Sequence, residues 1–120
     1  RSHSLAEFAA DRDLQDATGM SFIAAVQEAV DISLHVATEE ALGMPGSFHE
    51  GFALLASNAI LPNELAERLG DVVRVRHRVV HGYASVDFAR FWRELPDGID
   101  ALERFSAALA KWLGGPPRAR

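Results

Sequence analysis

The chain has 120 residues, 48% of them apolar and 24% charged, so it is long enough for one domain with a buried core and too short for two ordinary domains. Cysteine is absent, which excludes disulfides, thiolate metal sites and a cysteine nucleophile. The formal net charge of −5 argues against a protein that holds long nucleic acid through nonspecific phosphate contacts. With no apolar run of membrane-spanning length and no signal-peptide pattern, we expect a soluble, cytoplasmic protein without membrane association.

Helical periodicity begins close to the N terminus. Ser4 and Glu7 have capping-box spacing and predict a short helix from Leu5. From Leu14 to about Leu42, apolar residues recur at spacings of three and four, which predicts a long amphipathic helix. A polar stripe lies on another side of this helix and comprises Gln27, Glu28, Asp31, His35 and Thr38.

Glycine and proline divide the middle of the chain. The sequence GMPG at residues 43–46 predicts a break, and Ser47 is placed to cap a helix that extends to about Asn58. Pro62 suits the first turn of the next helix. This helix is expected to run to His81, with Gly82 as the left-handed residue that ends it. Glu64 and Arg68, four residues apart within it, have the spacing of a surface ion pair.

The last part of the chain predicts two further helical segments. Asp87 is placed to cap the sequence FARFWREL, and Pro96 is expected to kink or interrupt the helix before GIDALERFSAALAKWL. The tail, residues 114–120, is expected to be disordered. Residues 1–113 therefore predict a single all-α domain, an antiparallel up-and-down bundle of four to five helices.

A basic segment interrupts this acidic bundle. Residues 74–83 contain three arginines, two histidines and the only tyrosine of the chain. On a helix of about 100° per residue, Arg74, Arg78 and His81 share one face, and His77 stacks one turn before His81. Arg76 lies about 140° from His81 on the same helix. One site that uses both residues therefore requires either a loosened helix end or a second copy of the chain.

Residue types alone leave the role of the segment open. A histidine here can exchange a proton near pH 7, but a basic helix end is more often an ordinary solvated surface. His77 and His81 have the one-turn spacing of a metal site without an identifiable third ligand. We therefore predict no metal and no cofactor. An acid of the polar stripe, Asp31, is a candidate to orient Arg76 or His81 from a neighbouring helix, although a solvated stripe is the commoner explanation.

The order of residues in RHRVVHGY resembles the signature of the HepT-like branch of HEPN-domain ribonuclease toxins. That signature is an arginine, a polar residue, three further positions, a histidine, any residue and a tyrosine. Here Arg76, His77, His81 and Tyr83 match it, with His77 in place of the usual asparagine. The stretch from Asp11 to Val36 is similar to the long helix of that family, and the resemblance extends over residues 4–113.

Family members usually carry another helix before the region SLAEFAADRDL, and this chain begins at Arg1 without a methionine. We therefore expect a HEPN-like bundle that is missing an N-terminal helix through truncation or processing.

The resemblance implies the toxin of a type VII-like toxin–antitoxin system, a metal-independent endoribonuclease in which the 2′-hydroxyl of RNA attacks the adjacent phosphate. It implies proton transfer by His81 and stabilisation of phosphate charge by Arg76. Auxiliary roles are expected for His77 and Asp31, and RNA binding for Arg74 and Arg78.

The same resemblance implies a homodimer with a shared cleft and a partner, a nucleotidyltransferase antitoxin of the MNT type that transfers AMP to Tyr83. A purely structural role for Tyr83, as a half-buried ring, stays open. The alternative function is a non-catalytic HEPN module that binds a partner nucleotidyltransferase or a nucleotide.

Overall fold

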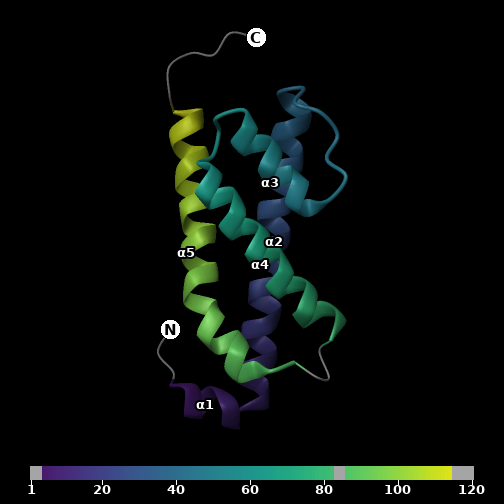
Figure 1. Ribbon diagram of the computed structural model, residues 1–120. Coiled ribbons are helices and arrows are strands. Elements are labelled where there is room, and N and C mark those ends of the chain that lie inside the picture. The colour runs from purple at the N-terminus through teal and green to yellow at the C-terminus, as the bar shows by residue number, and fades with distance from the viewer. Residues whose placement is uncertain (1–3, 83–85, 115–120) are drawn as a thin grey trace.

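The computed structural model describes residues 4–82 and 86–114, which form helices joined by short connections with no β-strand among them. Figure 1 shows the arrangement of the five helices, and the predicted all-α fold is confirmed. Their bounds are α1 (Leu5–Ala10), α2 (Arg12–Glu39), α3 (Phe48–Ser57), α4 (Asn63–His81) and α5 (Phe88–Leu113).

The starts of α1, α3 and α5 follow the predicted caps, whereas α2 begins at Arg12, two residues before the predicted start, with Asp11 as its cap. Ser4 and Glu7 form both hydrogen bonds of the capping box before α1. The Ser47 side chain accepts from the Glu50 N–H at the start of α3, and Asp87 accepts from the Arg90 N–H at the start of α5. These predictions are confirmed because a cap depends only on residues within one turn, which the sequence shows directly.

Two details of the predicted helix ends are corrected. Of the kink or interruption expected at Pro96, the interruption is wrong, because α5 is continuous through Pro96 and the two segments form one helix. Leu95 and Gly98 are buried on either side of Pro96, and packing of this face maintains the helix despite the missing N–H. Gly82 ends α4 by donating to the Arg78 carbonyl, but its φ of −127° is not left-handed.

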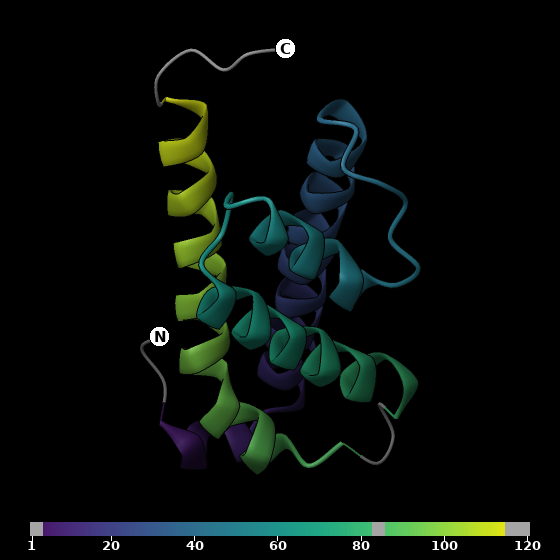
Figure 2. The same cartoon turned by 45° about the horizontal axis from the view of Figure 1, so that its top comes forward.

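The core lies among α2, α4 and α5, with α3 packed on α2 and α4 and α1 packed on α2 and α5. Figures 1 and 2 show α2 and α5 running along the molecule, while α4 begins beside α5 and crosses diagonally over α2. Phe8 of α1 is fully buried, with its ring centroid 4.7 Å from that of Trp92. Phe52 and Phe105 join α3 to α5 edge to face at 5.5 Å.

Helix α2 is unusually apolar for its length. One 18-residue window of it has a mean hydropathy of 1.2, so α2 is long and apolar enough to cross a membrane by length and composition alone, contrary to the prediction that no such run exists. However, α2 contacts each of the other four helices, and Phe22, Val26 and Val30 are buried in the core. Its apolar stripe therefore fits the central helix of a bundle.

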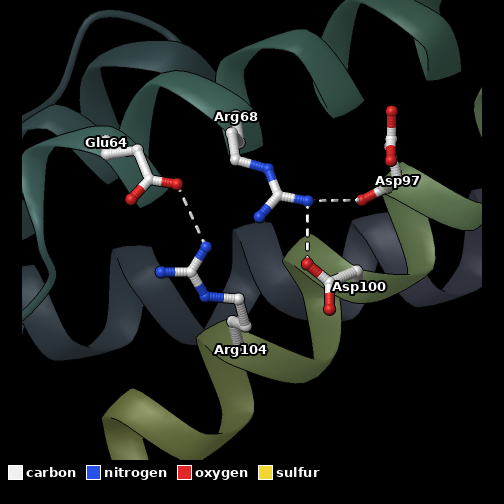
Figure 3. A network of polar contacts seen from close by, with 5 residues as sticks. All are labelled: Glu64, Arg68, Asp97, Asp100 and Arg104. Atoms are coloured by element: carbon white, nitrogen blue, oxygen red, sulfur yellow. Dashed lines mark hydrogen bonds and ion pairs between the residues drawn. The ribbon is translucent and has the colours of Figure 1, made fainter.

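Ion pairs join the N-terminal half of α4 to α5 (Figure 3). Arg68 donates to Asp100 at 2.9 Å and to the Asp97 carbonyl at 3.2 Å, and Arg104 donates to Glu64 at 3.1 Å. The hydrogen bond and negative charge of Glu64 raise the pKa of the Arg104 guanidinium. The predicted pair between Glu64 and Arg68 is therefore wrong, because both side chains bind α5 in preference to each other.

Candidate functional site

The predicted site residues lie on the C-terminal half of α4, and Arg76 is directed from it toward α2 and α3. The Nη2 atom of Arg76 donates to Gln27 Oε1 of α2 at 3.0 Å. Its guanidinium carbon lies 5.5 Å from the centroid of the Phe48 ring at the start of α3. The Nε atom is buried and has no hydrogen-bond partner within the described part of the chain. Arg76 of α4 is therefore half-buried and contacts both α2 and α3.

A second hydrogen bond continues from Gln27 to Asp31. The Gln27 Nε2 atom donates to Asp31 Oδ1 at 2.9 Å, one turn along α2. The exposed Asp31 thus reaches Arg76 through Gln27. The sequence placed Gln27 only in a polar stripe. Its four-residue spacing from the candidate Asp31 was the available signal for a link between them.

His77 and His81 form a stacked pair on another side of α4. Their ring centroids are 4.1 Å apart and their planes are inclined by 37°, as the one-turn spacing predicted. Both side chains are exposed. Within residues 4–82 and 86–114, no third histidine or carboxylate is placed to complete a metal site with them.

Most of the other predicted site residues line a groove between α4 and α5. Its larger part has a volume of about 890 Å³ and includes Arg74, and its smaller part has about 430 Å³ and includes His81. Both parts are lined by His77 and Arg78. Of the three residues predicted to share one face, Arg78 lines both parts, Arg74 lines the larger part and His81 lines the smaller part. Arg76 lines neither part, so the groove does not bring Arg76 and His81 together.

The arginines of the groove are already paired with carboxylates. Arg74 forms an ion pair with Asp71, one turn earlier on α4. The Nη2 atom of Arg78 donates to both carboxylate oxygens of Glu94 at 2.7 and 2.9 Å, and Arg90 approaches the same carboxylate at 3.5 Å. A phosphate bound by Arg74 or Arg78 would therefore have to compete with a carboxylate for the guanidinium.

The predicted modification site cannot be placed in this geometry. Tyr83 lies outside the described residues, as do residues 115–120 of the tail that was expected to be disordered.

Comparison with known proteins relates these features to one family. The family model described as Ribonuclease HepT-like matches residues 1–109. The chain is 29% identical over 99 residues to a protein named mRNA nuclease HepT from Shewanella oneidensis, covering 82% of this chain and 74% of that protein.

Solved structures show the same fold. The tri-AMPylated Shewanella oneidensis HEPN toxin in complex with MNT antitoxin matches with a TM-score of 0.81 and 25% identity over 87% of this chain and 78% of that one. A toxin–antitoxin structure with AMP-PNP matches with a TM-score of 0.80 and 24% identity over 86% and 79% of the two chains.

Proposed function

The chain belongs to the ribonuclease HepT-like family, and from this premise we propose that it is the RNA-cleaving toxin of a type VII-like toxin–antitoxin pair. The similar protein from Shewanella oneidensis is named an mRNA nuclease, and a solved relative is an AMPylated HEPN toxin in complex with an MNT antitoxin. These names support a ribonuclease whose partner is a nucleotidyltransferase antitoxin, in the cytoplasm where RNA is available.

The proposed reaction uses the RNA's own 2′-hydroxyl and no metal ion. His81 accepts the proton of this hydroxyl as its oxygen forms a bond to the adjacent phosphorus, and a protonated histidine donates to the 5′-oxygen as the P–O5′ bond breaks. The products are a 2′,3′-cyclic phosphate and a free 5′-hydroxyl. Arg76 stabilises the additional negative charge on the phosphorane-like transition state, where a fixed guanidinium is more effective than a mobile one.

One observation carries this proposal: Arg76 is a half-buried arginine with a prearranged guanidinium. A basic helix end that served only as solvated surface would not need an arginine held by another helix and an aromatic ring. The same geometry directs Arg76 toward α2 and α3, while His81 lines the groove with α5. We therefore propose a composite site in a homodimer, in which Arg76 of one protomer and His81 of its partner act on the same phosphate.

Auxiliary roles follow from the contacts of the neighbouring residues. His77 stacks on His81 and restricts the orientation of its ring. Arg74 and Arg78 contribute to RNA binding as they exchange carboxylate partners for phosphate, which makes their contribution dependent on salt concentration.

The reaction is tested with purified protein and RNA in the presence of EDTA. We expect wild-type cleavage that leaves cyclic phosphate ends, and a loss of about 10²-fold or more in His81→Ala, because a general acid–base group contributes about 10²–10⁴-fold. Arg93→Ala is the control, since Arg93 is an exposed arginine on α5 that lines neither part of the groove. An inert wild-type protein that still binds its antitoxin would instead support the non-catalytic module.

A further inference from the structure

We propose that Gln27 is a positioning residue for Arg76, and that Asp31 contributes to the site by fixing the direction of the Gln27 amide. This inference rests on the proposed ribonuclease function and assigns the polar stripe of α2 a specific part in it. Gln27 is half-buried, accepts from Arg76 Nη2 at 3.0 Å and donates to Asp31 Oδ1 at 2.9 Å.

Hydrogen-bond chemistry permits only one direction for this amide. An ionised carboxylate accepts and never donates, and a guanidinium donates and never accepts. The Gln27 NH₂ group must therefore face Asp31, and its carbonyl oxygen must face Arg76. A flipped amide would set its NH₂ group against the guanidinium and its oxygen against the carboxylate. Asp31 thus reinforces the amide orientation that accepts from Arg76.

The guanidinium of Arg76 has few other restraints. The buried Nε atom has no partner in the described residues, and Phe48 contacts the guanidinium through its ring without directing any N–H group. The bond to Gln27 is consequently the directional contact that sets the rotation of the planar group. A guanidinium carries five N–H donors, and Gln27 occupies one on Nη2, so Nη1 and the second hydrogen of Nη2 can bind phosphate oxygens.

Loss of this contact therefore affects the position of Arg76 more than the fold. In the Gln27→Met variant, a side chain of similar length removes both amide hydrogen bonds. A displacement of about 1 Å at a reacting group costs up to about 10²-fold in rate. We expect kcat to fall about tenfold or more with a smaller change in KM, because the transition state depends on the orientation of Arg76 more strongly than ground-state binding does.

Variants at Asp31 separate positioning from direct catalysis. In Asp31→Asn the Oδ1 atom still accepts from Gln27, so we expect kcat to stay within about threefold of wild type. In Asp31→Leu the Gln27 amide loses one of its two directional partners while Arg76 still favours its oxygen, so kcat should fall below wild type, by less than in Gln27→Met. Glu39→Leu, which removes another exposed carboxylate of α2, is the matched control and should behave as wild type. If Asp31→Asn is as impaired as Asp31→Leu, Asp31 acts through its charge or its proton and the proposal is wrong.

A double-mutant cycle tests whether Gln27 acts through Arg76. In an Arg76→Ala background, Gln27→Met should cause no further loss of kcat, since the group that it positions is gone. An additional loss equal to that in the wild-type background would show a general structural effect and overturn the proposal.

Hydrogen exchange of the Arg76 guanidinium with solvent, followed by NMR, gives a measurement that does not depend on RNA cleavage. The Nε–H signal of Arg76, assigned by its absence in Arg76→Lys, should exchange slowly in the wild-type protein because Nε is buried. Gln27→Met removes a hydrogen bond of about 1 kcal/mol from the Arg76 guanidinium and should accelerate this exchange about tenfold. Asp31→Leu should accelerate it by less, and Glu39→Leu should leave it unchanged. Unchanged exchange in Gln27→Met overturns the positioning role, whereas absent cleavage in wild type overturns the proposed function alone.

Discussion

Tyr83 is the only tyrosine of the chain, which makes the proposed silencing step testable at a single residue. In that step the phenolic oxygen attacks the α-phosphate of ATP, AMP is transferred, and pyrophosphate leaves. Added negative charge and bulk near the basic segment should then repel RNA.

Incubation with ATP, Mg²⁺ and a cognate MNT-type transferase should therefore add one or more AMP masses to wild type and abolish cleavage. The Tyr83→Phe protein should keep its mass and its RNA cleavage under the same conditions. Intact-protein mass spectrometry measures both chains, and AMP addition to Tyr83→Phe would contradict the assignment.

At the same residue scale, the sequence predicted local geometry well and long-range partners poorly. The stacking of His77 on His81 follows from helix spacing and is confirmed. The separation of Arg76 from the groove that contains His81 agrees with their predicted angular offset. In contrast, Gln27 as the partner of Arg76 depends on how α2 and α4 are aligned, and a helical period contains no information about that alignment.

At the scale of elements, helix starts were predictable and one helix interior was not. Caps depend on neighbouring residues, but the persistence of α5 through Pro96 depends on the burial of Leu95, Gly98 and Ala101 against other helices. Proline costs about 3 kcal/mol relative to alanine inside an unpacked helix, so the helix propensity of the local sequence favours a break at Pro96. Tertiary packing outweighs that local cost here.

Replacement of Pro96 measures this cost in the folded protein. Pro96→Ala restores an N–H donor within α5 at an exposed position and should raise the free energy of unfolding by about 1 kcal/mol or more. Urea denaturation gives the value, with Ala107→Gly, an exposed site on the same helix, as a control expected to lower it by about 1 kcal/mol. A Pro96→Ala protein that is less stable than wild type would show that the proline ring stabilises the fold by more than the missing N–H costs.

At the scale of the whole molecule, the two proposed catalytic side chains are directed toward different neighbouring helices. Arg76 is held toward α2 and α3, whereas His81 lines the groove between α4 and α5. The all-α bundle was predictable from helical periods and short connections, and it is confirmed. Which side of each helix contacts which neighbour was not predictable, because it depends on side-chain packing between segments far apart in sequence.

The composite site is tested most directly by complementation between two chains of strongly reduced activity. Arg76→Ala and His81→Ala proteins are each purified, mixed under conditions that allow protomer exchange, and assayed for RNA cleavage in EDTA. Mixed dimers contain one site with both residues intact, so activity should return to about a quarter of the wild-type value, since half of the dimers are mixed and one of their two sites is restored. A mixture that stays as inactive as its components would contradict the shared site.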